Sequence, residues 1–149
     1  MRYYGIAEVP GVGSNRMILK MIREMFPNHD DDSTIAWCSI FMHYIAREAG
    51  YYVTRGSDAG MARSWLNVGI PVDLSEAVPG DIAVFWRGSK EGSLGHVGLF
   101  INLRDPDTLR ILGGNQDNAV NIRFYQRARL LGLRRIAMPG EVDLTPPVM

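Results

Sequence analysis

The stretch PGDIAVFWRGSKEGSLGHVGLFINL, Pro79 to Leu103, marks the point at which the periodicity of the sequence changes. Two short runs rich in Val, Ile and Phe flank SKEGS, whose composition is typical of a turn. Three similar runs follow: TLRILGGN at 108–115, AVNIRFY at 119–125 and LLGLRRIAMPG at 130–140. The pattern predicts an antiparallel meander or a small barrel, in which the last run is a candidate fifth strand.

Upstream of Pro79 the apolar residues recur at helical spacing. Three helices are predicted there: one from Ser14 or Asn15 to about Phe26, one from Ile35 to about Ala49 with Asp32 or Ser33 as N-cap, and a short one after Ser57 or Asp58. Because helices precede the strands, we expect an α+β fold with N-terminal helices packed on a small antiparallel sheet or half-barrel. We expect one domain over 1–140 and a tail at 141–149.

The chain has 149 residues, of which 46% are hydrophobic, and its composition limits the classes of partner that it could bind. The 16 basic residues balance the 16 acidic ones, so we expect neither nucleic acid nor an anionic membrane as a partner, and we expect a monomer. The start of the chain, MRYYGIAEVPGVGSN, lacks the regions of a signal peptide, and no run approaches the roughly 18 apolar residues of a spanning helix. These features predict synthesis in the cytoplasm and no stable membrane insertion.

Cys38 is the only cysteine and lies near the start of the second predicted helix, in TIAWCSIFMHYIAREAGYY, 34–52. A single cysteine forms no internal disulfide, so its thiol is free for chemistry. The dipole and the unpaired N–H groups of a helix start stabilise a thiolate. Cys38 is therefore a candidate nucleophile, and the alternative is a small apolar core residue.

A nucleophilic cysteine needs a base, and the chain has 3 histidines. His43 lies on the same helix as Cys38, at about 140° around its axis, and points away from it. His29 lies in the polar run NHDDDST, where a solvated or capping role is the simpler interpretation. His96 opens a strand, and alternation puts Gly98 on its face, which predicts room for a substrate beside the ring. His96 is the candidate base; a structural role at the strand end is the alternative.

A third polar group commonly holds the tautomer of such a histidine. In TLRILGGNQDN the alternation of the strand puts Gly113 and Asn115 on one face, so Asn115 is the first candidate. Gln116 and Asp117 remain alternatives. The composition of GGNQDN also favours a simple hairpin turn without a catalytic role.

These segments together resemble a known family. WCSIFMHYIAREAGY, ARSWLNVGIPV, PGDIAVFWRG, GHVGLF, LGGNQDNAVNI and RLLGLRR are similar, in this order, to the papain-like cell-wall hydrolases. These include the NlpC-type peptidases and the CHAP (cysteine, histidine-dependent amidohydrolase/peptidase) domains, and the segments look like a phage-associated branch. The resemblance runs from about 14 to 136. It implies a papain-like fold, with Cys38 as nucleophile, His96 as base and Asn115 in the third position.

The chain departs from the family pattern at Gly113, where many CHAP domains carry an acidic residue, so Asn115 or a neighbour would orient the ring unaided. Some CHAP domains also bind calcium through acidic residues upstream of the cysteine, a neighbourhood occupied here by Asp30, Asp31 and Asp32. Three adjacent aspartates do not reproduce a loop of alternating ligands, and N-capping and solvation explain them. We expect no cofactor.

The resemblance implies cleavage of the peptide part of peptidoglycan, as an endopeptidase or an N-acetylmuramoyl-L-alanine amidase. The enzyme would be a phage endolysin that reaches the wall with the help of a holin, or a lysin carried by the virion. A papain-like toxin or effector and a catalytically silent virion-associated binding module are the alternatives. The charged residues of 118–140 are all arginines, which form either a surface for an anionic wall polymer or solvated strand edges.

Overall fold

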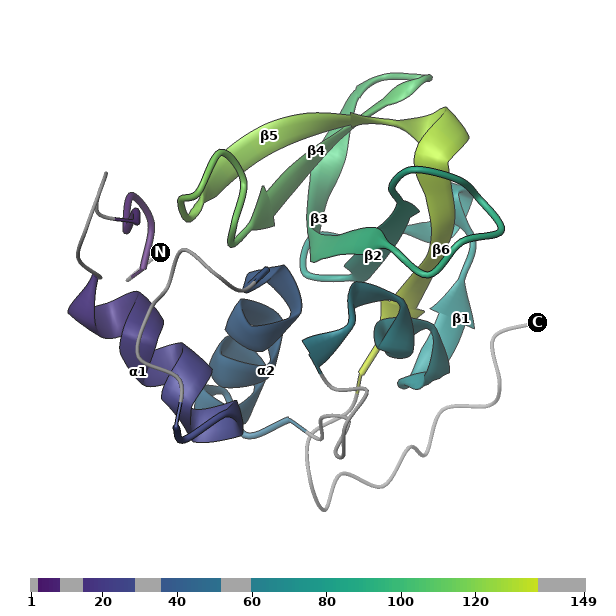
Figure 1. Ribbon diagram of the computed structural model, residues 1–149. Helices are drawn as coiled ribbons and strands as arrows, with labels where there is room; N and C mark the ends of the chain where they lie inside the picture. The colour runs from purple at the N-terminus through teal and green to yellow at the C-terminus, as the bar shows by residue number, and fades with distance from the viewer. Residues whose placement is uncertain (1–2, 9–14, 29–35, 52–59, 137–149) are drawn as a thin grey trace.

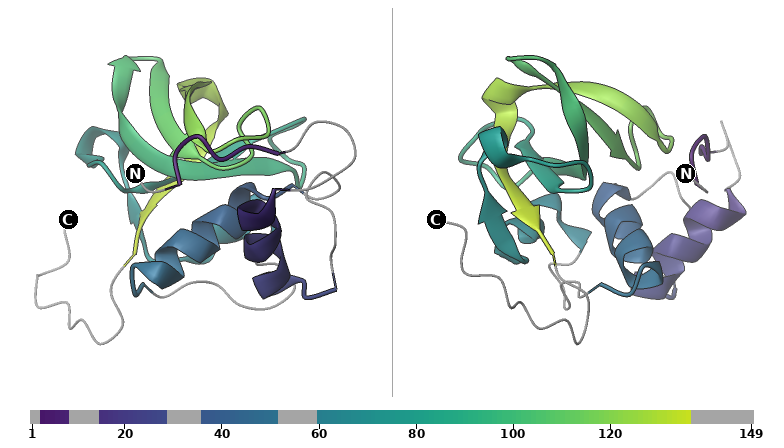
Figure 2. Two further views of the ribbon diagram at one scale, coloured as in Figure 1. Left: turned by 90° about the vertical axis from the view of Figure 1, so that its left-hand side faces the viewer. Right: turned by 180° about the vertical axis from the view of Figure 1, so that it is seen from behind.

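A computed structural model describes residues 3–8, 15–28, 36–51 and 60–136 of the chain. Both α-helices lie on one side of a six-stranded sheet, as Figures 1 and 2 show. This arrangement confirms the predicted α+β class. The elements are α1 (Arg16–Met25), α2 (Cys38–Glu48), η3 (Ala62–Asn67), β1 (Ile70–Val72), η4 (Leu74–Glu76), β2 (Ile82–Trp86), β3 (Gly95–Asp105), β4 (Thr108–Gly113), β5 (Asn121–Gln126), η5 (Arg127–Arg129) and β6 (Leu130–Arg135).

The sheet has the strand order β1-β6-β2-β3-β4-β5, and all its pairings are antiparallel. β2 to β5 form the predicted meander, and β6, the candidate fifth strand, returns to the other edge of β2. β1 and β5 remain edges, so the sheet curls into an open half-barrel of the papain-like kind (Figure 1). β1 was not predicted, because a three-residue strand that contains Pro71 is too short to display alternation.

The first predicted helix is confirmed as α1, and its N-cap is Asn15. The Asn15 side chain accepts hydrogen bonds from the N–H groups of Met17 and Ile18, at 2.8 and 3.3 Å. These N–H groups lie in the first turn and have no acceptor within the helix. Ser14, the alternative cap, lies outside the described residues. Ile18, Met21 and Ile22 of this helix are buried and belong to the hydrophobic core.

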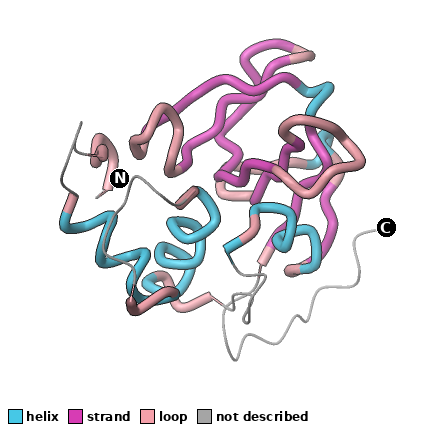
Figure 3. Tube along the Cα trace, viewed as in Figure 1, coloured by secondary structure: helices cyan, strands magenta, loops and turns pink. Residues whose placement is uncertain are grey.

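The second predicted helix corresponds to α2, which begins at Cys38 and not at Ile35. The predicted caps Asp32 and Ser33 lie outside the described residues, as do Ser57 and Asp58. The third predicted helix is a 3-10 helix, η3, and Figure 3 shows it apart from α1 and α2. It ends before Gly69, whose φ of +64° allows the chain to turn into β1.

Two hydrophobic cores lie on the two faces of the sheet. The larger core joins α1, α2 and η3 to the inward residues of β2 and β3, among them Ile82, Val84 and Val97. The smaller core contains Phe85 and Ile111 and lies on the opposite face of the sheet. Within the part of the chain that is described, no helix has the length and apolarity needed to cross a membrane.

Candidate active site

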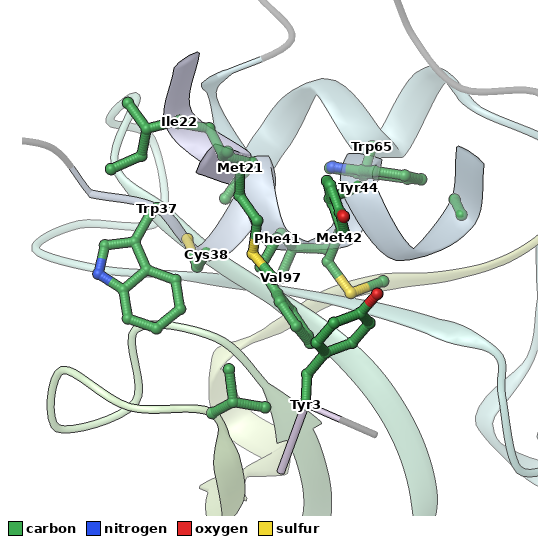
Figure 4. Close-up of a cluster of buried hydrophobic side chains, with 14 of the residues drawn as sticks. Tyr3, Met21, Ile22, Trp37, Cys38, Phe41, Met42, Tyr44, Trp65 and Val97 are labelled. Atoms are coloured by element: carbon green, nitrogen blue, oxygen red, sulfur yellow. The ribbon is translucent and has the colours of Figure 1, made fainter. Parts of the chain in front are cut away.

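Cys38 is the first residue of α2, where the N–H groups of the helix have no partner within it. The N–H of Phe41 donates to the carbonyl of Trp37, at 2.9 Å, and closes the first turn. Cys38 is 3% exposed and belongs to the larger core, with Trp37 beside it in Figure 4. The position therefore has the burial expected of a core residue and the helix start expected of a nucleophile.

The thiol of Cys38 is held in a protonated state by its surroundings. Burial raises its pKa, and hydrogen bonds from the backbone N–H groups of Val97 and Ser39 only partly oppose this rise. Val97 directly follows His96 in β3, so this contact puts the sulfur against the strand that carries the imidazole. Attack by Cys38 thus requires a base that takes its proton.

His96 is a buried residue near the start of β3, and its Nε2 lies 2.9 Å from Oε1 of Gln116. Burial lowers the pKa of His96 to about 4, against the opposing effect of the Gln116 hydrogen bond. The positive charge of Arg87 lowers the pKa of His96 further. The imidazole is consequently neutral near pH 7.

The hydrogen bonds of Gln116 indicate which ring nitrogen carries the proton. Nε2 of Gln116 lies among acceptors: the carbonyl and Oδ1 of Asn121, at 2.7 and 3.1 Å, and the carbonyl of Ile111, at 3.3 Å. This environment assigns the amide nitrogen to that side and directs the amide oxygen toward the ring. Because the oxygen only accepts, His96 donates from Nε2–H, and the lone pair of Nδ1 is free to accept a proton.

The imidazole pairs with Gln116, one of the two alternatives, and not with Asn115, the first candidate. β4 ends at Gly113, and Asn115 has a left-handed φ of 55°, so the alternation that favoured Asn115 does not extend to it. Within the described residues the Asn115 side chain makes no hydrogen bond. Asp117 is exposed and pairs with Arg123 at 3.0 Å.

A comparison with protein-family models matches the CHAP domain over residues 30–115, more than half of the chain. The chain belongs to the CHAP domain family. CHAP domains are generally cysteine peptidases or amidases of the cell-wall hydrolase superfamily, and this membership supports peptidoglycan hydrolysis. The match spans Cys38 and His96 and ends one residue before Gln116. No curated protein matches the chain.

Two glycines of this CHAP domain are surrounded by the protein's own side chains. A Cβ at Gly98 would lie 2.5 Å from Cγ2 of Ile111, so the room predicted there for a substrate does not exist. A Cβ at Gly113 would lie 2.8 Å from Oε1 of Gln116 and 3.4 Å from Nε2 of His96. The position at which many CHAP domains carry an acid thus has no side chain, and Gln116 reaches the ring instead.

Two aromatic residues beside the imidazole were not identified from the sequence. The ring of Tyr125 stacks on that of His96, with centroids 4.8 Å apart and planes 9° apart, and Phe85 stacks on Tyr125 at 4.9 Å. Burial raises the pKa of Tyr125, and the charge of an ionised Cys38 raises it further. Tyr125 therefore contacts His96 and lies within the field of Cys38. Its place in a strand of mixed polarity contains no signal for this role.

The N-terminal segment braces the loop that carries Gln116. Ala7 forms an isolated antiparallel bridge with Ala119, and the indole of Trp37 donates to Oε1 of Glu8 at 2.7 Å. This segment thus links the Gln116 loop to the residue that precedes Cys38.

The other predicted polar residues lie away from the imidazole or outside the described chain. His43 is buried and its ring lies 4.5 Å from that of Trp65, which agrees with its predicted direction away from Cys38. His29 and Asp30–Asp32 lie outside the described residues. Several arginines of 118–140 contact other parts of the protein: Arg123 pairs with Asp117, Arg135 with Asp81, and Arg129 lies over the ring of Trp86.

Proposed function

We propose that this CHAP domain hydrolyses an amide bond in the peptide part of peptidoglycan, with Cys38 as the nucleophile and His96 as the base. One observation carries the proposal: a buried thiol at a helix start contacts the strand on which a neutral imidazole has its Nδ1 free. We further propose Gln116 as the third residue, in place of Asn115, because its amide oxygen accepts from the ring.

In the proposed reaction, Nδ1 of His96 accepts the proton of the thiol while the sulfur forms a bond to the amide carbonyl carbon. The carbonyl π electrons move to oxygen, and the N–H of Cys38 at the helix start donates to this oxyanion. As the C–N bond breaks, Nδ1–H protonates the leaving amine and a thioester remains. Water then attacks the thioester, again with Nδ1 as base, and releases the acid and the thiol.

We extend the proposal to the biological setting that the sequence resemblance favours, a phage lysin. Such a protein would be made in the host cytoplasm and would reach the wall through a holin, or would travel in the virion. The cut would lie within the peptide stem or cross-link, or at the sugar-lactyl amide.

The test is fragment release from purified sacculi. The wild type should release peptide fragments, identified by mass spectrometry, whereas Cys38→Ser and His96→Gln should release none. Because the chain has only 1 cysteine, alkylation with iodoacetamide modifies a single thiol and should abolish release as well.

His29→Gln is the matched control, since it removes a histidine that the sequence assigns to a solvated loop, and it should retain activity. Thermal unfolding of each variant verifies that it is folded. Equal release by the wild type and Cys38→Ser, or no release from any of several wall types, would overturn the proposal and favour a binding module or a toxin with another target.

A further inference from the structure

Arg87 follows β2, at the edge of the candidate active site. Its N–H donates to the carbonyl of Leu94, at 3.0 Å, so the pairing of β2 with β3 continues beyond the end of the strand. Within the strands, Phe85 lies opposite His96. Alternation therefore directs the Arg87 side chain to the same face of the sheet as Phe85 and His96.

The aromatic stack joins the residues of this face to the imidazole. Phe85 stacks on Tyr125, and Tyr125 stacks on His96, with successive centroids 4.9 and 4.8 Å apart. The charge of Arg87 lowers the pKa of both Cys38 and His96, in agreement with a guanidinium close to the pair. Arg87 thus lies beside the site.

The guanidinium of Arg87 is exposed, and within the described residues it forms no ion pair or hydrogen bond. Other arginines of the protein have carboxylate partners: Arg47 pairs with Glu24, Arg123 with Asp117 and Arg135 with Asp81. Arg87 therefore presents an unused fork of N–H donors next to a buried nucleophile.

We propose that Arg87 is a specificity residue that binds a free carboxylate on a substrate unit flanking the scissile amide. This inference rests on the proposed function and specifies its substrate as an anionic peptide. A planar guanidinium matches a carboxylate through two parallel N–H···O bonds, a geometry that a lysine does not reproduce. A carboxylate bound there would hold the adjacent carbonyl at the thiol.

The assignment distinguishes between the two classes of bond. Acidic units of a peptide stem retain a free carboxylate next to the amide that they form, whereas the sugar-lactyl amide to alanine has no free carboxylate on either flanking unit. Arg87 therefore favours an endopeptidase over an N-acetylmuramoyl-L-alanine amidase.

The test uses two synthetic peptides built around the bond identified in the sacculus digest. They differ only in a free carboxylate or a primary carboxamide on one flanking unit. The wild type should prefer the carboxylate peptide by about 10-fold to 100-fold in kcat/KM, the range expected of a hydrogen bond between charged groups. In Arg87→Gln the ratio of kcat/KM on the two peptides should fall to about 1, whatever the effect of the lost charge on Cys38 and His96, and Arg87→Lys should retain only part of the preference.

Arg104→Gln is the matched control, because Arg104 is an exposed arginine at the far end of β3, and it should keep the preference. An equal loss of kcat/KM on both peptides in Arg87→Gln would overturn the inference and leave Arg87 as a charge that acts only on Cys38 and His96. A digest in which neither unit flanking the cut bears a carboxylate would overturn it too. In both cases the hydrolase itself would be active, so the proposed function would stand; failure to digest sacculi marks the failure of that function.

Discussion

At the scale of single residues, the most informative contact is the amide of Gln116 on His96. A carboxylate in that place would stabilise the imidazolium and raise the pKa of the ring. The amide oxygen orients the ring with a weaker effect, so burial still lowers the pKa of His96 to about 4. The resting pair is a neutral thiol and a neutral imidazole, and in the proposed reaction the proton moves only when the substrate is attacked.

The contact predicts different effects for two neighbouring alanine variants. Gln116→Ala should lower kcat by about 10-fold to 100-fold, because the ring loses its orienting partner. This loss in kcat is smaller than the one expected for removal of the base itself. Asn115→Ala should change kcat by less than about twofold, because its side chain makes no hydrogen bond within the described residues. Steady-state kinetics on one peptide measures both.

The ¹⁵N chemical shifts of the His96 ring provide a readout that a purely structural defect would not move. In the wild type they should report a proton on Nε2, and in Gln116→Ala a mixture of tautomers. A wild type protonated on Nδ1, or a larger loss of activity in Asn115→Ala than in Gln116→Ala, would contradict the assignment of the third residue.

Burial of His96 also predicts a pH dependence of stability. Its pKa is about 4 in the folded protein, against the 6.5 of an unperturbed imidazole, as in the unfolded chain. Between these values the unfolded state binds a proton that the folded state does not, so stability increases with pH through this window and is lost as the pH falls. The loss attributable to His96 is about 3 kcal/mol between pH 7 and pH 4.

Urea unfolding at the two pH values measures this loss. His96→Gln should lose less stability than the wild type over the same interval, by about that amount. The carboxylates titrate in both proteins and cancel in the comparison. Parallel stability curves for the two proteins would show that His96 is not buried in its neutral form.

At the scale of elements, the loop between β2 and β3 is held by one side chain. Arg63 of η3 donates from Nε to the carbonyl of Leu94 at 2.9 Å, and from its two terminal nitrogens to the carbonyls of Lys90 and Ser89 at 2.8 and 2.7 Å. The loop connects Arg87 to Gly95 and His96. Arg63, which lies outside the site, thus holds the loop whose ends flank the site.

Removal of the Arg63 side chain should loosen the loop between β2 and β3 without unfolding the protein. In Arg63→Ala, hydrogen exchange of residues 88–94 should become about 10-fold faster, because each lost hydrogen bond contributes about 1 kcal/mol. Arg63→Lys retains the charge but not the fork of donors, and should protect the loop only partly. Unchanged hydrogen exchange of residues 88–94 in Arg63→Ala would show that the loop keeps its conformation without the Arg63 hydrogen bonds.

At the scale of the whole molecule, an ion pair links the end of β6 to the start of β2, the strand of the meander on which β6 pairs. Nε of Arg135, at the end of β6, lies 2.8 Å from Oδ1 of Asp81, and a second guanidinium nitrogen donates to Oδ2 at 2.9 Å. The Asp81 side chain is 2% exposed and directly precedes β2. Its oxygen Oδ2 also accepts from the N–H of Val78 at 2.9 Å.

Loss of this pair should lower the stability of the fold without a direct effect on catalysis. Arg135→Met should reduce the free energy of unfolding by about 1–3 kcal/mol, because it leaves a buried carboxylate without its cation; access of water to Arg135 limits the loss. Arg123→Met, which breaks the exposed pair with Asp117, should cost less than about 1 kcal/mol. Urea denaturation measures both changes in the free energy of unfolding. Equal losses in the two variants would contradict the expectation that the ion pair of the buried Asp81 contributes more than the exposed pair.

The local patterns were sufficient for the helices and for the strands of the meander. The repeat of apolar residues in α1, its cap at Asn15 and the alternation in β2 to β4 are properties of neighbouring residues. Cys38 and His96 were predicted for the same reason, since a helix start and a strand start are local contexts. The short strand β1 and the 3-10 form of η3 were not predicted, because few residues carry their signal.

The site beyond these two residues depends on contacts between distant segments. Asn115, Asp117 and Asn118 have positive φ angles, and Ala7 of the N-terminal segment pairs with Ala119 of this loop. Strand periodicity therefore does not extend to Asn115, and Gln116 contacts the ring instead. Local spacing alone determined the α+β class and indicated Cys38 and His96 as candidate reacting residues. Only the tertiary structure decided that Gln116 meets the ring and that Arg87 faces the site, because loop conformation and strand adjacency arise from long-range packing.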